Sequence, residues 1–265
     1  MFWQRLLVTL ALGPLALYLV YLGGWFYFLP LLLMLLLATV EYCHLLQHLG
    51  WKPLVWLLLP ANLLFFVDGQ WPDLGLLNVA FAITLFATML YGLWLYEGRH
   101  SETAAADWLT MNAGILIVGW LGSHFFRLRN VLTQPWQWTA LALVAIWVAD
   151  SAAYAFGKRF GRRKLAPRLS PNKTVEGYIS GIIAGTALSV IAASLLHLPV
   201  GLAGLFGLLT CTFSPAGDLA ISLLKRQAGV KDSGNLLPGH GGALDRVDSL
   251  LWSVTIAYYF VIFLA

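Results

Sequence analysis

Long apolar runs follow one another along almost the whole chain, and they restrict the folds that this sequence can adopt. A helix needs about 20 apolar residues to cross roughly 30 Å of hydrocarbon, and about nine runs approach that length. They lie near residues 6–22, 25–43, 53–67, 76–96, 106–124, 136–156, 177–197, 200–224 and 249–265. Only 11% of the residues are charged, whereas a soluble domain carries charges on about a quarter of its positions. The sequence therefore predicts an all-α polytopic membrane protein with about nine transmembrane helices.

The distribution of basic residues predicts how these helices are oriented. With nine crossings and an internal N-terminus, most lysines and arginines fall in cytoplasmic segments, whereas the outer loops keep Arg127 and Arg129. This asymmetry follows the positive-inside rule and predicts a cytoplasmic N-terminus and an outer C-terminus. The third run is short and contains Pro53 and Pro60, so it is also compatible with a broken or re-entrant segment. Loss of this crossing would change the number of crossings from odd to even. We expect an integral membrane protein with its basic loops facing the cytoplasm.

Two polar loops, residues 157–176 and 225–248, hold nearly all of the remaining charge. We assign both to the cytoplasm and to a C-terminal catalytic transmembrane region, residues 136–265, which follows N-terminal transmembrane helices in residues 1–135. By charge alone, the first loop is typical of an anchor that touches anionic lipid. Its final residues, 170–174, read Ser-Pro-Asn-Lys-Thr and lead directly into the next helix. This detail exceeds what an anchor requires and favours a functional loop.

Aspartates within the apolar runs are the next unusual feature. Asp150 ends the sixth run and Asp218 lies inside the eighth, where an aspartate costs about 2.5–3.5 kcal/mol at mid-helix. Asp218, Ser222 and Lys225 are spaced i, i+4 and i+7, so one helical face carries a carboxylate, a hydroxyl and an ammonium group. Pairing with a basic residue on a neighbouring helix is the structural alternative. We favour a polar cavity wall, because ionisable residues within membranes usually serve function.

Glycines surround His240 in the second polar loop. Gly239, Gly241 and Gly242 allow backbone N–H groups to approach an anion closely, as in phosphate-binding nests. The basic side chains that could neutralise phosphate oxygens there are Lys225, Arg226, Lys231 and Arg246. The combination predicts a phosphate site, although a histidine between glycines is also typical of a turn.

Paired carboxylates begin the last predicted helix. Asp245 and Asp248 are spaced i and i+3, so both can point to one side. Mg²⁺ is typically held by one or two carboxylates together with substrate phosphates and water. We therefore predict that Asp218, Asp245 and Asp248 are metal ligands. The two cysteines, Cys43 and Cys211, lie in predicted helices and support neither a disulfide framework nor a thiolate metal site.

The second polar loop resembles the signature of the phosphatidate cytidylyltransferase family, also called CDP-diacylglycerol synthases. The matching residues are Ser222, Lys225, Arg226, Lys231, Asp232, His240, Gly241, Gly242, Asp245, Arg246 and Asp248. A second conserved region of that family is similar to Asp150, Ala153, Tyr154, Gly157, Ser170, Pro171, Lys173, Thr174, Glu176 and Gly177. The resemblance covers residues 145–265. It departs at Ala243, where the family usually has a larger aliphatic residue, and this affects packing.

The resemblance implies an enzyme that makes CDP-diacylglycerol and pyrophosphate from phosphatidic acid and CTP in phospholipid biosynthesis. It also implies a homodimer in the lipid bilayer, a cytoplasmic cavity open laterally to lipid, and dependence on Mg²⁺ with a monovalent cation such as K⁺ beside it. Nucleic acid is not an expected partner. The residues that we assign to catalysis are Asp218, Lys225, Lys231, Asp245 and Arg246. The residues that we assign to substrate binding are Lys173, Ser222, Arg226, His240, Gly241 and Gly242.

Two other functions stay open at the level of sequence. A CTP-dependent enzyme that acts on another lipid phosphate or on a lipid alcohol would carry a similar motif. A membrane transporter, which belongs to a different class, would also keep aspartates in broken helices. A transporter should show paired halves, and we find no internal repeat. The roles of Asp150 and Asp232 are not assigned.

Overall fold

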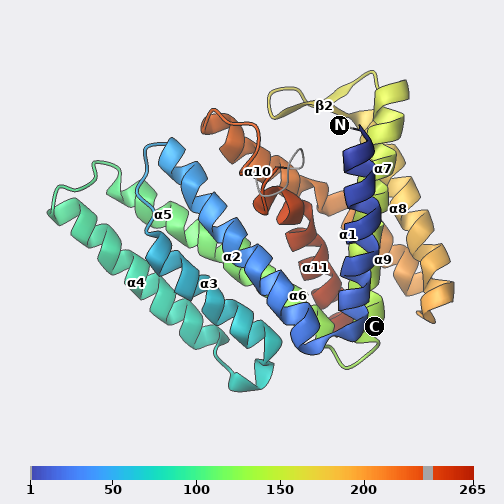
Figure 1. Cartoon of the computed structure of the whole chain (residues 1–265), viewed down its shortest axis with the longest axis horizontal. Helices are drawn as coiled ribbons and strands as arrows, with labels where there is room; N and C mark the ends of the chain where they lie inside the picture. The colour runs from blue at the N-terminus through green and yellow to red at the C-terminus, as the bar shows by residue number, and fades with distance from the viewer. Residues whose placement is uncertain (1, 235–240) are drawn as a thin grey trace. The chain divides into compact units, whose positions relative to one another are not determined.

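The computed structural model describes residues 2–234 and 241–265, with side chains from residue 12 onward. Helices dominate the described part of the chain (Figure 1). In chain order they are α1 (Phe2–Leu22), α2 (Gly24–His48), α3 (Val55–Gln70), α4 (Leu77–Glu97), α5 (Ala104–Gly114), α6 (Leu121–Arg129), α7 (Pro135–Phe160), α8 (Val175–Leu196), α9 (Val200–Phe213), α10 (Pro215–Gln227) and α11 (Leu244–Leu264). A 3₁₀ turn, η1 (Pro72–Leu74), follows α3, and a π-helical stretch, η2 (Ile115–Trp120), joins α5 to α6.

Seven helical segments in the described residues are long and apolar enough to cross a membrane. Two of these segments combine several elements: Ala104–Arg129 contains α5, η2 and α6, and Val200–Gln227 contains α9 and α10. Two shorter apolar helices, Leu12–Leu22 and Val55–Gln70, occupy the first and third apolar runs of the sequence. Every predicted run therefore corresponds to helical structure. The all-α polytopic membrane character is confirmed, with seven segments that meet the length criterion.

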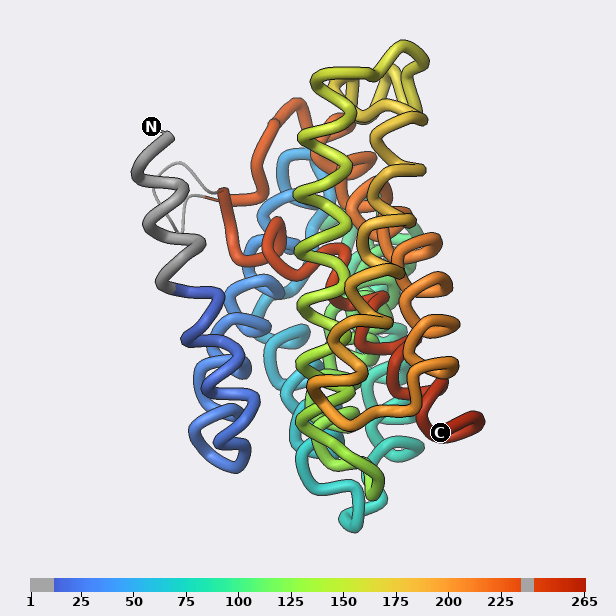
Figure 2. The backbone as a smooth tube through the Cα atoms, turned by 90° about the vertical axis from the view of Figure 1, so that its right-hand side faces the viewer, coloured from blue at the N-terminus to red at the C-terminus, as the bar shows by residue number. Residues whose placement is uncertain are grey.

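The first polar loop contains a short antiparallel hairpin, which the all-α prediction did not include. Strands β1 (Lys164–Ala166) and β2 (Ser170–Thr174) pair with Lys164 opposite Thr174. Thr174 ends β2 and begins α8, because its hydroxyl oxygen accepts the N–H of Gly177 at 3.1 Å. This is the N-cap role for which threonine is favoured. Figure 2 shows the hairpin, in yellow, beyond the ends of α7 and α8.

The chain folds into two compact units that do not follow sequence order. The first contains Met1–Ala16, Leu22–Arg127 and Leu224–Val247, and the second contains Leu17–Tyr21, Leu128–Leu223 and Asp248–Ala265. The described residues of the second polar loop up to Val247 therefore belong to the same unit as most of the N-terminal helices. The catalytic region over residues 136–265 stays a prediction based on sequence.

Small residues pack α8 closely against α7 in the second unit. A Cβ atom at Gly181 would lie 2.8 Å from the carbonyl oxygen of Ala149, and one at Gly185 would lie 3.0 Å from that of Ala145. Such contacts explain why glycine recurs every fourth residue along α8, since small residues allow helix backbones to approach closely in membranes. The glycines therefore allow the backbones of α7 and α8 to lie close together.

Two buried carboxylates in the first unit have structural partners. Asp68 on α3 forms an ion pair with Arg127 on α6, and their side chains are only 2% and 11% exposed. Asp107 on α5 accepts the backbone N–H of Lys52 at 2.8 Å and the hydroxyl of Ser101 at 2.5 Å. Buried charges are stable when they are paired and hydrogen-bonded in this way. Both carboxylates are therefore accounted for by the fold.

Candidate functional site

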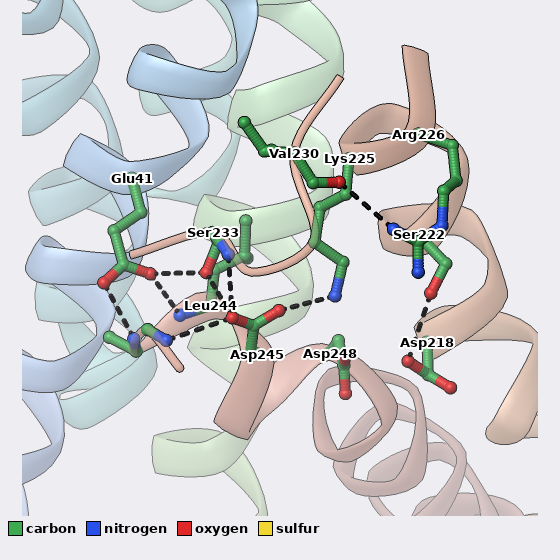
Figure 3. A network of polar contacts seen from close by, with 12 residues as sticks. Glu41, Asp218, Ser222, Lys225, Arg226, Val230, Ser233, Leu244, Asp245 and Asp248 are labelled. Atoms are coloured by element: carbon green, nitrogen blue, oxygen red, sulfur yellow. Dashed lines mark hydrogen bonds and ion pairs between the residues drawn. The ribbon is translucent and has the colours of Figure 1, made fainter. Parts of the chain in front are cut away.

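Asp245 lies at the start of α11 and is held by several donors within the first unit (Figure 3). Its Oδ1 accepts a hydrogen bond of 2.5 Å from Nζ of Lys225. Its Oδ2 accepts bonds from the backbone N–H of Ser233 at 2.8 Å, the Ser233 hydroxyl at 2.9 Å and the N–H of Gly242 at 3.0 Å. The Lys225 and Asp245 side chains are each 8% exposed. The charges of Lys225 and Asp245 therefore balance within a buried ion pair, and the other donors hold the Asp245 carboxylate in place.

Glu41 on α2 joins this network from the N-terminal part of the chain. Its Oε1 accepts the N–H of Ala243 at 2.9 Å, and its Oε2 accepts the N–H of Leu244 at 2.9 Å and the hydroxyl of Ser233 at 2.8 Å (Figure 3). Sequence analysis assigned no role to Glu41. The signal that could have identified it is a carboxylate inside an apolar run, since such residues are costly in a membrane.

A second cluster of predicted site residues lies in the other unit. Lys173 of β2 forms an ion pair with Asp218 of α10, and their side chains are 32% and 22% exposed. The Ser222 hydroxyl lies 3.5 Å from Oδ1 of Asp218, as the i, i+4 spacing predicted (Figure 3). Asp150 on α7 interacts electrostatically with both Lys173 and Asp218. Asp218 is therefore paired with a basic residue, as the structural alternative required. The partner, however, lies on the hairpin and not on a neighbouring helix, and it is itself a predicted substrate ligand.

Asp248 and Arg226 make local contacts. Asp248 is 7% exposed, and its Oδ1 accepts the backbone N–H of Ser249 at 2.6 Å and the Ser249 hydroxyl at 3.2 Å. Arg226 is exposed near the end of α10, and its guanidinium donates to the carbonyl oxygen of Val230 at 3.2 Å. Arg226 therefore orders the turn that follows α10.

Three further predicted residues lie at the surface of the described structure. Lys231, Asp232 and Arg246 have exposed side chains, as expected for groups that would meet a charged substrate from solvent. Gly241 has φ of +75°, a left-handed conformation that favours glycine. His240 lies outside the described residues, so its predicted role stays a prediction.

The backbone around Gly242 forms a nest for anions, and the protein's own carboxylates occupy it. The N–H of Gly242 donates to Asp245, and those of Ala243 and Leu244 donate to Glu41. These three N–H groups therefore bind carboxylates of the protein itself. Substrate binding by Gly241 and Gly242 stays a prediction, and a phosphate would compete with these carboxylates for the N–H groups.

Each unit presents carboxylate oxygens of the kind that bind Mg²⁺ together with substrate phosphates. Within each unit, the described residues contain no group of three or more His, Cys, Asp or Glu side chains that could hold a metal alone. Oδ2 of Asp245 lies within bonding distance of three donors, one of which is the Ser233 hydroxyl that it shares with Glu41. Oδ1 accepts one bond, from Lys225, and keeps a lone pair to offer. Oδ1 of Asp218 has one weak contact, with Ser222 at 3.5 Å. Such hard oxygen ligands suit Mg²⁺ when phosphates and water supply the rest of the coordination shell.

Comparison with known proteins gives a consistent match over nearly the whole chain. The family model described as "Cytidylyltransferase family" matches residues 3–264. A protein of Bacillus subtilis named phosphatidate cytidylyltransferase is 38% identical over 213 residues, covering 78% of this chain and 75% of its own length. Proteins with the same name are 32% identical in Synechocystis sp., covering 98% and 97% of the two chains, and 34% identical in Brucella suis, covering 97% and 92%.

Proposed function

Because the chain belongs to the cytidylyltransferase family, we propose that it makes CDP-diacylglycerol and pyrophosphate from phosphatidic acid and CTP. The observation that carries this proposal is that relatives named for the activity align with the chain along most of its length. The site chemistry agrees with it, because carboxylates, lysines and an anion nest gather in the segments that the sequence motif predicted. No observation favours the transporter alternative over this one.

The proposed reaction is a direct displacement at phosphorus. An ionised phosphate oxygen of phosphatidic acid attacks the α-phosphorus of CTP, and a new P–O–P linkage forms. The bond from the α-phosphorus to the oxygen that bridges to the β-phosphorus breaks, and pyrophosphate leaves with the electron pair. The attacking oxygen already carries negative charge, so no strong general base is required. Catalysis then depends on positioning and on neutralising phosphate charge.

The basic residues are proposed to bind and orient the phosphates. Lys225 and Lys173 already neutralise carboxylates, and a triphosphate or a lipid phosphate would compete for the same ammonium groups. The exposed side chains of Lys231 and Arg246 would bind phosphate oxygens, and arginine can bind two oxygens at once. Arg226 would support the same segment through its contact with the following turn.

We propose that Mg²⁺ binds through Asp218, Asp245 and Asp248, with a monovalent cation such as K⁺ beside it. When bound, Mg²⁺ supplies charge neutralisation at the phosphate oxygens. Ser233 and Gly242 hold the Asp245 carboxylate, and Ser222 lies beside Asp218. These contacts would limit the movement of the ligands and favour one coordination geometry.

We also propose nine crossings of a bacterial inner membrane, with the N-terminus and the active site on the cytoplasmic side and the C-terminus outside. In the part of the chain that the structure describes, seven helical segments of spanning length and two shorter apolar helices support this count. The basic residues support the orientation. The bacterial origin of the relatives supports the location. A homodimer is part of the same proposal and rests on the family resemblance.

Product analysis with purified protein tests the proposed function. The detergent-solubilised chain is incubated with phosphatidic acid, CTP and MgCl₂, and the lipids are analysed by mass spectrometry. CDP-diacylglycerol should form only when all components are present. Faster turnover of an isoprenoid phosphate, or phosphorylation of diacylglycerol, would identify the related alternatives. Solute uptake in proteoliposomes without CTP turnover would contradict the proposal.

A further inference from the structure

We propose that Glu41 is a positioning residue of the active site, which holds Ser233 and the start of α11 so that Asp245 keeps its place. The inference rests on the proposed function, because it concerns a predicted Mg²⁺ ligand and the partner of Lys225. Glu41 itself is on α2, about 200 residues before the loop that it contacts. All of these residues belong to the first unit.

Glu41 supplies the N-terminal cap that α11 lacks in its own sequence. The first N–H groups of a helix have no partner within the helix, and Ala243, which precedes α11, has no side-chain acceptor. Glu41 accepts the N–H groups of Ala243 and Leu244, each at 2.9 Å. Its negative charge also lies at the positive end of the helix dipole. The beginning of α11 is therefore fixed by a side chain from a different helix.

Two glycines, Gly234 and Gly242, make room for this carboxylate. A Cβ atom at Gly242 would lie 2.5 Å from Cδ of Glu41, and one at Gly234 would lie 2.8 Å from it. Real Cβ atoms do not approach other atoms this closely, so a side chain at either position would force Glu41 to move. The glycine next to the left-handed Gly241 thus has a physical role, which is close backbone approach to Glu41.

Ser233 connects Glu41 to Asp245. Its hydroxyl lies 2.8 Å from Oε2 of Glu41 and 2.9 Å from Oδ2 of Asp245. The backbone N–H of Ser233 donates to the same Asp245 oxygen at 2.8 Å. A shift of Glu41 would therefore reach Asp245 through Ser233 and through the N–H of Gly242. Productive ligand geometry must be held within roughly 0.5 Å, so such a shift would impair the site.

If Glu41 instead hindered substrate binding, its removal would change the kinetics in a different way. Glu41 occupies backbone N–H groups that could otherwise bind phosphate, so its carboxylate could act as an internal competitor of the substrate. Removing a competitor would lower the KM for CTP. Removing a positioning residue would lower kcat and weaken the response to Mg²⁺.

Glu41→Gln tests the proposal because glutamine keeps the size but loses the charge and presents an NH₂ group to backbone donors. We expect turnover per folded molecule to fall roughly 10- to 100-fold, as for other residues that orient metal ligands. The Mg²⁺ concentration for half-maximal activity should rise. Amide hydrogen exchange of residues 242–245 should accelerate, and this readout does not depend on activity. Glu41→Asp keeps the charge but has a shorter side chain. It should recover part of the turnover, of the response to Mg²⁺ and of the protection from hydrogen exchange.

Two further variants complete the experiment. Glu97→Gln removes an exposed carboxylate at the end of α4 and should match the natural chain in all three measurements. Ser233→Ala removes the bridge but leaves the Glu41 contacts with the backbone, so it should raise the Mg²⁺ requirement even if Glu41→Gln does not fold. Unchanged turnover and Mg²⁺ dependence in folded Glu41→Gln, or a lower KM for CTP, would overturn the proposal.

Failure of the proposed function is distinguishable from failure of this inference. If the natural chain makes no CDP-lipid, the function is wrong, and hydrogen exchange then decides the role of Glu41. Faster exchange at residues 242–245 in Glu41→Gln, with other helices unchanged, supports positioning of this segment. Unchanged exchange there overturns it.

Discussion

The two lysine–aspartate pairs differ in burial, and this difference predicts how much each carboxylate contributes to stability. The Lys225 and Asp245 side chains are each 8% exposed, whereas those of Lys173 and Asp218 are 32% and 22% exposed. Removing one partner of a buried pair costs about 3–5 kcal/mol, because the other charge is left uncompensated. A partly exposed pair contributes about 0–1 kcal/mol. We therefore expect Asp245→Asn to lower the free energy of unfolding by about 3–5 kcal/mol and Asp218→Asn by about 0–1 kcal/mol.

The surroundings of Lys173 increase this contrast. Asp150 interacts with Lys173, so that ammonium group keeps a carboxylate neighbour in Asp218→Asn. The free energies can be compared by denaturant unfolding in detergent, followed by the fluorescence of the 12 tryptophans. A difference of about 3 kcal/mol corresponds to more than a hundredfold change in the unfolding equilibrium. Equal destabilisation by the two substitutions would refute the argument from burial.

Three further predictions address the packing and the metal. Arg127→Met leaves the buried Asp68 carboxylate without its cation, so unfolding measurements should show a loss of about 3–5 kcal/mol; turnover per folded molecule should not change, and a loss of turnover would contradict a purely structural role. Gly185→Ala places a Cβ atom 3.0 Å from the carbonyl oxygen of Ala145 and should lower the free energy of unfolding by about 1–3 kcal/mol. Gly201→Ala, with nothing within 4 Å of the added atom, is its matched control and should unfold like the natural chain. Chelation with EDTA should stop pyrophosphate release and added MgCl₂ should restore it, whereas activity that persists in EDTA would contradict the Mg²⁺ proposal.

The helices were predictable because the bilayer imposes a length that the sequence must satisfy. Apolar runs of spanning length identified the helical segments, including the composite one that contains η2. The hairpin was not predictable in the same way, since β1 has three residues and β2 has five. Such short polar strands do not show an alternating pattern of apolar residues. The two strands pair where they contact α7 and α8. These contacts exist only in the folded protein, so the local sequence does not reveal them.

Contacts along one helix were also predictable, whereas contacts between distant segments were not. The spacing of Asp218 and Ser222 predicted one helical face, and the structure places the hydroxyl 3.5 Å from the carboxylate. The pairing of Lys173 with Asp218 joins residues 45 positions apart, and Glu41 contacts Leu244 across 203 positions. No periodicity connects such residues. The family motif identified their neighbourhood, but it did not include Glu41.

Phosphatidate-dependent release of pyrophosphate from CTP tests the central claim most directly. Asp218→Asn is the most informative variant, because loss of its partly exposed ion pair should destabilise the protein less than Asp245→Asn does. Asp73→Asn, which changes an exposed aspartate in η1, is the matched control. The account predicts lipid-dependent release by the natural chain and by Asp73→Asn, and loss of release in Asp218→Asn. Full activity in Asp218→Asn would contradict the site, and no release by the folded natural chain would contradict the function.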